Sequence, residues 1–445
     1  MHTQTFKGEY DLLALHSQNP ARYPFLLESV ATSPLSRYSL LFAFPQESIR
    51  LDDLAETSFC GRLDEAWRKE NPPSLLLSGE GQAMPFRGGW FLYLGYELVG
   101  QLEPTLQLPD TPAGLPIALA VRIPAAVIVD HQHGETAVIA EAGFEGAFAD
   151  ILQDMAISYP SPDKGELEDV YVSEDLPEKF TAGVDRIREY IAAGDVFQVN
   201  LSRAWRGAIQ STHSAADIYR LLRKTNPAPF ACLANFDEFA VISSSPERLV
   251  RVQAGRVDTR PIAGTRPRGD DPEQDQALLA ELIAHPKERA EHIMLIDLER
   301  NDLGRICEYG TLKVDELMAV ESYQHVHHIV SNIQGRLREG MTPGQIIRAV
   351  FPGGTITGCP KVRCMEIIAE LEQTGRGAYT GSIGYLNHNG DMDLNILIRT
   401  MTLQGTQLQF RTGAGIVMDS VAANELKETR HKARGLLRAL GHDMG

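Results

Sequence analysis

Short apolar runs bounded by turn residues recur along this chain, and they limit the folds that it can adopt. Their length and composition are typical of β-strands rather than of helices. They lie at 36–44 (SRYSLLFAF), 88–98 (GGWFLYLGYEL), 125–130 (AAVIVD), 196–205 (VFQVNLSRAW), 239–245 (FAVISSS) and, less regularly, 408–417 (LQFRTGAGIV). Predicted strands and helices intermix without a strict βαβ alternation. This favours a layered α/β or α+β protein over a doubly wound sheet.

The stretch 158–175 divides the chain into two predicted regions. Its sequence, SYPSPDKGELEDVYVSED, is rich in proline, serine and acidic residues, as linkers are. We therefore expect an N-terminal region at 1–157 and a second region at 176–445. The second region begins with apolar residues at helical spacing over 180–191, and Gly194 follows as a C-cap.

The formal net charge of −17 restricts the partners of the chain. It argues against nucleic-acid binding through phosphate neutralisation, and an anionic substrate would need local cations to overcome the repulsive field. The sequence has no apolar run long enough to span a bilayer and no signal peptide at its start. The five cysteines lack CxxC spacing, so we expect reduced thiols in a cytoplasmic protein, with neither a disulfide framework nor a zinc site.

The segment 351–364, FPGGTITGCPKVRC, has the composition of an anion-binding loop that runs into a helix. Its glycines permit tight turns, Thr355 supplies a hydroxyl, and Pro360 suits a first helical position. A helix N-terminus with Lys361 beside it would hold a carboxylate. An ordinary glycine-rich loop entering a helix explains the same residues equally well.

A first acidic segment, KERAEHIMLIDLERNDLGR (287–305), puts Glu291 on a helical stripe with Met294, Leu295 and Leu298. A carboxylate on an apolar stripe needs a cation or a proton, because burying it alone is costly. The pattern fits a metal ligand, and it also fits a helix-end acid paired with an arginine.

A second segment, 411–440, combines glycines at a strand end with charged residues on one helical stripe. The residues in question are Gly413, Ala414, Gly415, Glu425, Glu428 and Lys432. The backbone around the glycines could meet a carboxylate, but Glu428 and Lys432 also have the i,i+4 spacing of a solvated salt bridge. If carboxylates from both segments met, oxygen ligands alone would suit Mg²⁺ rather than zinc.

Glu247 follows three serines at the end of a strand-like run, where a general acid or base is plausible. The arginines that follow in DTRPIAGTRPRG (258–269) also fit a hairpin with a solvated, charged tip. His328 in an apolar strand is more often structural than catalytic. Arg399 follows the apolar run LNILI, and a buried guanidinium needs an anion.

Together these motifs resemble the chorismate-utilising enzymes. SPER, PIAGT, EHIMLIDLERNDLGR, GTITGCPK, GSIGY and GAGIVMDS occur in the order typical of that family, most densely from about 178 to 440. The resemblance implies an α+β fold of two β-sheets packed as a sandwich, with helices outside and the active site in the cleft between. It assigns 1–157 to the N-terminal region of the family and 176–445 to its chorismate-binding catalytic domain, with 158–175 as the linker.

The resemblance also assigns roles to single residues. Glu291 and Glu428, with Glu425 nearby, match the ligands of Mg²⁺, which would hold the ring carboxylate of chorismate, and Glu247 matches the general acid. The assigned pocket for the enolpyruvyl carboxylate and the ring contains Tyr379, Arg399, Lys432, Gly413, Ala414, Gly415, His328 and Thr355. Gly264, Thr265 and Lys361 are further expected to contact substrate, Lys361 in a structural or carboxylate-holding role.

The position of Ala263 bears on which member of the family the chain resembles. Isochorismate and salicylate synthases have a lysine there that activates water, and many aminodeoxychorismate synthases have one that adds to the ring. Alanine in PIAGT is instead similar to anthranilate synthases, whereas ITGCPKVRCMEII and SYQHVHHIVSNI look more like aminodeoxychorismate synthase component I. We expect amination of chorismate at C4, with anthranilate synthesis as the alternative.

The sequence contains no Gly-x-Cys-x-Gly motif of a glutaminase. The resemblance therefore implies a separate glutamine amidotransferase subunit as the source of ammonia, and a chain that is a monomer or a heterodimer with that subunit. A member that binds chorismate or an aromatic end product without turnover is a further alternative. The LLES segment (26–29) suits such an end-product pocket or a plain helix end, whereas the paired acids Glu291 and Glu428 favour an enzyme.

Overall fold

The computed structural model describes residues 1–31, 36–70, 84–157, 165, 167, 170–269, 271–322 and 326–442, apart from the side chains of Thr265, Pro267, Lys287 and Val326. Within these residues the strands pair antiparallel in two large sheets, called sheet A and sheet B here. Sheet A has the order β1 (His2–Lys7), β8 (Glu135–Ala140), β7 (Ala125–Asp130), β3 (Tyr38–Ala43), β2 (Phe25–Glu28), β11 (Phe230–Asn235), β12 (Ala240–Ser245), β21 (Thr400–Gln404), β22 (Gln407–Ile416), β10 (Gln198–Ala208) and β18 (Gly358–Cys359), with β9 (Tyr171–Glu174) also paired to β10. Sheet B has the order β15 (Ile262–Pro267), β17 (Val326–Arg336), β14 (Arg256–Thr259), β13 (Arg248–Gln253), β20 (Met392–Asn395), β19 (Ser382–Asn387), β5 (Gly89–Leu94), β6 (Ala118–Ile123) and β4 (Ser48–Leu51), with β16 (Lys313–Ser322) also paired to β17.

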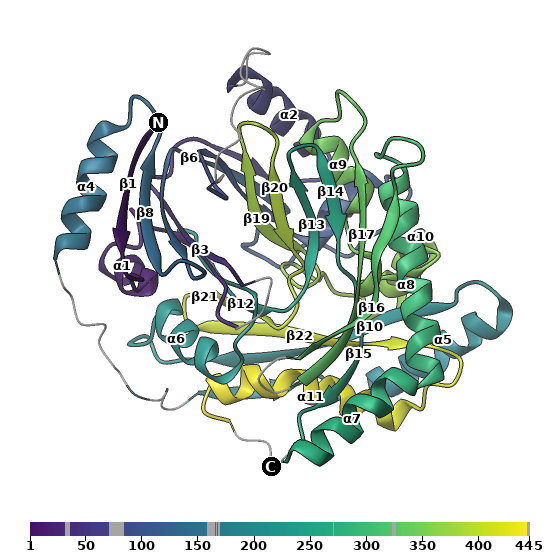
Figure 1. Ribbon diagram of the computed structural model, residues 1–445. Coiled ribbons are helices and arrows are strands. Elements are labelled where there is room, and N and C mark those ends of the chain that lie inside the picture. The colour runs from purple at the N-terminus through teal and green to yellow at the C-terminus, as the bar shows by residue number, and fades with distance from the viewer. Residues whose placement is uncertain are drawn as a thin grey trace.

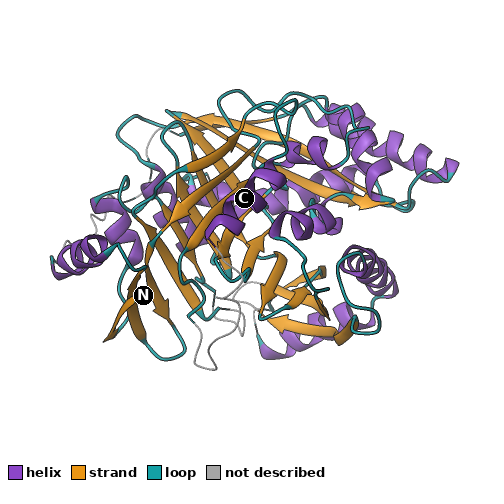
Figure 2. Cartoon of the chain, turned by 90° about the horizontal axis from the view of Figure 1, so that it is seen from above, coloured by secondary structure: helices purple, strands orange, loops and turns teal. Residues whose placement is uncertain are grey.

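Helices cover the outer faces of the two sheets, as Figures 1 and 2 show. On sheet A, α11 contacts β22, α6 contacts β12 and α4 contacts β8, while α8 lies on β15 and β17 of sheet B. The α-helices are α1 (Leu12–Gln18), α2 (Phe59–Glu70), α3 (Val99–Leu102), α4 (Glu145–Ala156), α5 (Pro177–Ala193), α6 (Ala215–Thr225), α7 (Pro272–Ala284), α8 (Pro286–Gly304), α9 (Pro343–Val350), α10 (Lys361–Glu372) and α11 (Ala422–Ala439). Short 3₁₀ turns are η2 (Tyr96–Leu98) and η3 (Gly354–Ile356).

The core between the sheets is aromatic and aliphatic. Phe25 and Phe42 of sheet A and Phe91 and Tyr93 of sheet B belong to one buried cluster, and the rings of Phe25 and Phe91 stack with centroids 4.0 Å apart. Alternation of side chains along each strand puts these residues on the inner faces. Two further apolar clusters bury the outer faces of the sheets under helices.

The chain crosses from sheet A to sheet B between β12 and β13, and it returns between β20 and β21. Hydrogen bonds join the two crossings. The N–H of Ile396 donates to the carbonyl oxygen of Glu247 at 3.0 Å, and that of Ser244 donates to the carbonyl oxygen of Arg399 at 3.1 Å. Two chain segments about 150 residues apart in sequence therefore place Glu247 and Arg399 in neighbouring connections.

The predicted α+β fold of two packed sheets with helices outside is confirmed. The predicted strands correspond to β3, β5, β7, β10, β12 and β22, and the predicted helix at 180–191 lies within α5, with Gly194 at φ 84° as its C-cap. Pro360 differs from the prediction, since it is the N-cap of α10 rather than its first residue. Within the described part of the chain, no helix has the length and apolar composition needed to cross a bilayer.

The two predicted regions contribute strands to both sheets. In sheet A, β2 pairs with β11, and in sheet B, β5 pairs with β19. Residues 171–174 of the predicted linker form β9, while most of 158–169 lies outside the described residues. The boundaries between the regions stay a prediction.

Candidate active site

Glu247 lies in the connection from β12 to β13 and is only 5% exposed. Its N–H donates to the hydroxyl of Ser245 at 3.2 Å, which fixes the turn. Burial raises the pKa of Glu247 to about 7, against the opposing effects of Thr355, Lys432 and Arg399. Oε1 of its carboxyl has no hydrogen-bond partner among the described residues. Glu247 can therefore hold a proton near neutral pH and give it to a group that enters the site.

Arg399 faces Glu247 from the returning connection. Its backbone has a φ of 51°, in the left-handed region that side-chain-bearing residues adopt sparingly. Burial lowers the pKa of its guanidinium, and Glu247 acts against that effect. Within the described residues, no hydrogen bond or ion pair to this guanidinium is present. An embedded guanidinium without an anionic partner is suited to bind an anion.

His328 reaches the same place from β17 of sheet B. It is 3% exposed. Burial, together with the charges of Arg399 and His327, lowers its pKa to about 3, although a hydrogen bond with the backbone of Gly264 acts in the opposite direction. The imidazole is therefore neutral near pH 7, so it can donate or accept a hydrogen bond but adds no positive charge.

Ala263, Gly264 and Thr265 lie on β15, which pairs with β17 beside His328. The register shifts between Ala263 and Thr265, and Gly264 at φ 69° forms the bulge. A Cβ on Gly264 would lie 3.1 Å from Oε2 of Glu288, so the strand packs closely against the start of α8. The predicted role of Thr265 falls on a side chain outside the described residues.

Tyr379 packs against the end of β22, the strand that carries Gly413 and Gly415. A Cβ on Gly413 would lie 2.7 Å from the hydroxyl of Tyr379, and one on Gly415 would lie 2.2 Å from Nε2 of Gln198. Gly413 is required here, because its Cβ would also lie 2.8 Å from the carbonyl oxygen of Leu201, whereas the flexible side chain of Gln198 could move away from a Cβ at Gly415. Ala414 points to the opposite face, where it is buried in the apolar cluster shared with α5 and α10.

Lys432 on α11 joins this group. Its Nζ donates to the carbonyl oxygen of Gly413 at 2.9 Å and lies 2.8 Å from Oε1 of Glu428. Lys432 also acts on the pKa of Tyr379 and of Glu247, so its charge reaches both sides of the site. The structure thus brings together Glu247, Arg399, His328, Thr355, Tyr379, Gly413 and Lys432.

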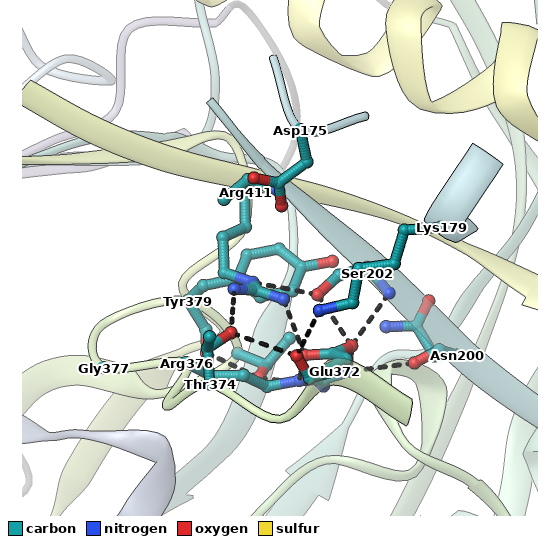
Figure 3. A network of polar contacts seen from close by, with 12 residues as sticks. Asp175, Lys179, Asn200, Ser202, Glu372, Thr374, Arg376, Gly377, Tyr379 and Arg411 are labelled. Carbon is teal, nitrogen blue, oxygen red and sulfur yellow. Dashed lines mark hydrogen bonds and ion pairs between the residues drawn. The ribbon is translucent and has the colours of Figure 1, made fainter. Parts of the chain in front are cut away.

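Behind Tyr379 lies a buried ion-pair network (Figure 3). The carboxylate of Glu372 binds Arg376 at 2.6 Å and Arg411 at 2.8 Å. Burial acts to raise the pKa of Glu372, but the two guanidinium groups outweigh it and hold the pKa below its usual value. Arg376 also donates to the carbonyl oxygen of Asn200 at 2.8 Å and lies 5.5 Å from the centre of the Tyr379 ring. The network therefore fixes the segment that presents Tyr379.

The glycine loop before α10 packs directly on the outside of the site. A Cβ on Gly354 would lie 2.3 Å from Cδ2 of Leu298 on α8, and one on Gly358 would lie 2.1 Å from the carbonyl oxygen of Gln198 on β10. The loop presents Thr355, whose buried Oγ1 is close enough to Glu247 to lower the pKa of its carboxyl, although no hydrogen bond of good geometry to this Oγ1 is present in the described part of the chain. Its glycines thus serve close packing, and the anion-binding function that the sequence suggested for it stays a prediction.

The ammonium of Lys361 is bound by protein groups. It contacts the carboxylate of Asp302 on α8 and donates to the carbonyl oxygen of Pro352 at 2.9 Å. These contacts attach the start of α10 to α8 and to the loop. The expected contact of Lys361 with substrate stays a prediction.

The three acids expected to hold Mg²⁺ lie on two helices, Glu291 on α8 and the other two on α11. Glu291 is half-buried, Glu425 is 9% exposed, and Glu428 is exposed and paired with Lys432. Among the residues that the structure describes, no three His, Cys, Asp or Glu side chains gather closely enough to hold a metal ion. A Mg²⁺ site built from two carboxylates, water and substrate oxygens does not need such a group, so the donor chemistry fits the ion. The metal-binding role of these acids stays a prediction.

Sequence analysis missed the polar groups that surround the predicted residues. The main ones are Asn200, Ser202, Glu299, Asp302, Glu372, Arg376 and Arg411, all buried. Glu372 and Arg376 have the i,i+4 spacing of an ion pair, but the same spacing is common on exposed helix faces. Glu299 and Asp302 stand in the quoted LERNDLGR motif without a feature that distinguishes them from surface acids.

Comparisons with known proteins show the family of the chain. A family model described as chorismate binding enzyme matches residues 23–438. The chain is 43% identical to an anthranilate synthase component I-like protein of Synechocystis, over 80% of this chain and 73% of that protein. It is also 43% identical to aminodeoxychorismate synthase component 1 of Bacillus subtilis, over 80% of this chain and 77% of that protein.

A solved structure supports the same conclusion. Anthranilate synthase component I from Streptococcus pneumoniae superimposes with a TM-score of 0.80 at 34% identity, covering 91% of this chain and 93% of that chain. The family match, the identities and the shared two-sheet fold agree, and the chain belongs to the chorismate binding enzymes.

Proposed function

We propose that this chain aminates chorismate at C4, forming 4-amino-4-deoxychorismate from chorismate and ammonia. The observation that carries the proposal is the pair formed by Glu247, a buried carboxyl with a pKa of about 7, and Arg399, an embedded guanidinium that makes no ion pair among the described residues. An acid beside a carboxylate-binding cation is the arrangement that loss of a hydroxyl from a dianionic ring requires.

In this proposal a carboxylate of the substrate binds to Arg399, and Tyr379 and Lys432 complete the pocket. The carbonyl of Gly413 holds Lys432 in place, so its charge is oriented before substrate arrives. These cations offset the repulsion that a chain of net charge −17 exerts on a dianion.

Glu247 donates its proton to the 4-hydroxyl, so that the C4–O bond breaks and water leaves. The nitrogen of ammonia forms the new bond at C4 and releases one proton, and Glu247 regains a proton for the next cycle. Ala263 supplies no nucleophile, so a transient adduct at C2, if one forms, comes from ammonia or water. Otherwise the substitution at C4 is direct.

Glu291 and Glu428, with Glu425 nearby, would hold Mg²⁺, which would supply a Lewis acid for the ring carboxylate. Before the metal binds, Lys432 offsets the charge of Glu428 at 2.8 Å. This arrangement requires that Lys432 interacts with both the metal ligand and the substrate pocket.

The proposal includes a cytoplasmic enzyme that receives its ammonia from a separate glutamine amidotransferase subunit. The component 1 name of the Bacillus subtilis relative supports a two-component system. Free ammonium salts replace the subunit in a test with the isolated chain.

A specific observation favours a second candidate, anthranilate synthesis. This chain has alanine at position 263. Many enzymes that aminate chorismate at C4 have lysine at this position, whereas anthranilate synthases have alanine. In that case ammonia adds at C2, and the enolpyruvyl group leaves as pyruvate. Both candidates use the same acid and the same carboxylate pocket.

The experiment measures loss of chorismate by the purified chain with ammonium and Mg²⁺ together, and with each one omitted. The proposal requires turnover only when both are present, and it requires that Glu247→Gln removes that turnover. Turnover without ammonium would mean that water replaces ammonia, and binding of chorismate without any turnover would make the chain a binding protein.

A further inference from the structure

One buried carboxyl close to the site has no role in the reaction described above. Glu299 lies on α8, eight residues after Glu291, and is 4% exposed. The backbone N–H of Gly354 donates to its carboxyl, and a Cβ on Gly354 would lie 3.4 Å from Oε1. Glu299 therefore contacts the glycine loop one residue before Thr355.

The contacts of Thr259 indicate that the carboxyl of Glu299 carries a proton. Its Oγ1 is 3.0 Å from the carbonyl oxygen of Leu249 and 3.3 Å from Oε2 of Glu299. The hydroxyl has one hydrogen, and a carbonyl oxygen can only accept, so the shorter contact takes that hydrogen. The longer contact is then a hydrogen bond only if Glu299 carries a proton and donates it to Thr259.

The backbone explains why Leu249 needs this hydroxyl. The register of β13 on β20 shifts between Arg248 and Val250, which removes Leu249 from the pairing. Its buried carbonyl oxygen is satisfied by Thr259, which is itself 2% exposed. If Thr259 turned its hydrogen towards an ionised Glu299, the carbonyl of Leu249 would lose this partner.

The charges around Glu299 favour the neutral form as well. Burial, together with the charges of Asp302 and Glu247, raises its pKa to about 8, although Lys361 and the N–H of Gly354 act in the opposite direction. Burial raises the pKa of Asp302 as well, but the ammonium of Lys361 is in direct contact with its carboxylate and favours ionisation of Asp302 over that of Glu299. Arg305 also acts on Asp302 rather than on Glu299.

We propose that Glu299 is a positioning residue that works as a neutral carboxylic acid. Its carbonyl oxygen accepts from the N–H of Gly354 while its hydroxyl donates to Thr259, and together these bonds hold Thr355 beside Glu247. Protonation of Glu299 and its contacts with the loop do not depend on the proposed function, whereas its effect on turnover rests on that function. Ionisation of Glu299 would break the hydrogen bond to Thr259 and would add the negative charge of Glu299 near Glu247.

The proton is tested without any turnover. Glu299→Gln keeps one acceptor and one donor but cannot ionise. The unfolded chain loses the proton of this glutamate near its ordinary pKa, while the folded chain keeps it up to about pH 8. The wild type should therefore lose stability relative to Glu299→Gln as pH rises from 5 to 8, with a urea midpoint difference that grows and then levels off. A difference that does not change with pH overturns the proposal.

Infrared spectroscopy gives a second measure of the same proton. The carbonyl stretch of a protonated, buried carboxylic acid should be present in the wild type at pH 7 and weaker in Glu299→Gln. Asp297→Asn on the exposed face of the same helix is the matched control and should leave this band unchanged, because Asp297 is 66% exposed. An identical band in wild type and Glu299→Gln overturns the proposal.

The positioning role is tested by kinetics with chorismate and ammonium. Glu299→Gln should keep kcat/KM within about twofold of the wild type, while Glu299→Ala and Thr259→Val should lower it by about tenfold through loss of the loop bonds. Rescue by glutamine but not by alanine separates the hydrogen-bonding role from mere filling of space. If Glu299→Gln is as impaired as Glu299→Ala, the neutral-acid role is wrong. If the wild type has no activity at all, the stability and infrared results still decide whether Glu299 holds a proton, and only the proposed function fails.

Discussion

The ammonium of Lys432 lies 2.9 Å from the carbonyl oxygen of Gly413, so the last helix is fastened to the strand end that Tyr379 closes. The same ammonium lies 2.8 Å from Glu428, one helical turn away. A residue expected on an exposed ion pair thus also contacts the backbone of the predicted substrate pocket. This double contact makes Lys432 the first test of the account.

Lys432→Ala should lower kcat/KM for chorismate by about 10- to 100-fold, mainly through a higher KM, because a charged hydrogen bond and a cation of the pocket are lost. Lys427→Ala on the exposed face of the same helix is the matched control and should have little effect. Steady-state kinetics at saturating ammonium and Mg²⁺ measure both variants. Equal kinetics in the two variants would remove Lys432 from the site.

The rate should depend on pH through Glu247. Its pKa is about 7, raised by burial, and the proposed step needs the protonated form. The value of kcat/KM should therefore fall as pH rises above about 7, after correction for the free ammonia present. The Glu247→Gln variant should be slower by about 10²- to 10⁴-fold, and its kcat/KM should no longer fall as pH rises above about 7. If kcat/KM of that variant still fell at alkaline pH as in the wild type, another group would be responsible for the fall.

The network behind Tyr379 should contribute strongly to stability. Arg376→Met leaves the carboxylate of Glu372 buried with one guanidinium fewer, and we expect a loss of about 3–5 kcal/mol in unfolding free energy. Arg186→Met breaks an ion pair whose side chains are 49% and 67% exposed, and it should cost much less, because water screens exposed charges. Urea denaturation at pH 7 compares the two. Similar losses would mean that the buried network is no stronger than a surface pair.

Removal of Mg²⁺ should stop turnover, and replacement of its proposed ligand should raise the metal requirement. Glu291→Gln should increase the Mg²⁺ concentration needed for half-maximal rate by about tenfold or more, because a neutral amide is a poorer ligand than a carboxylate. Asp297→Asn, on the exposed face of α8, should leave that concentration unchanged. Full activity after exhaustive chelation of the wild type would contradict a metal-dependent reaction.

Sequence alone predicted the layered fold, because short alternating strands and amphipathic helices reflect local burial. It also named Glu247, Arg399, His328, Tyr379 and Lys432, which the structure brings together across both sheets. Long-range pairing could not be predicted from these patterns. The two crossings that make Glu247 and Arg399 neighbours depend on hydrogen bonds between segments about 150 residues apart.

Buried polar residues were the largest omission. Glu299 and Arg376 look like ordinary surface charges in sequence. Only the packing of α8 against the glycine loop, and the contacts of Arg376 with Glu372 and the carbonyl of Asn200, reveal that they are buried. The structural role of Gly358 could not be predicted from sequence either. Its sequence context suggests an anion-binding turn, while its φ of 128° and its contact with Gln198 serve the pairing of β18 with β10.

The identity of the product tests the central claim most directly. The purified chain is incubated with chorismate, ammonium and Mg²⁺, and the product is identified by mass spectrometry and fluorescence, with pyruvate assayed in parallel. Amination at C4 predicts 4-amino-4-deoxychorismate, which retains the enolpyruvyl group, and no pyruvate. Fluorescent anthranilate together with an equal amount of pyruvate would contradict it.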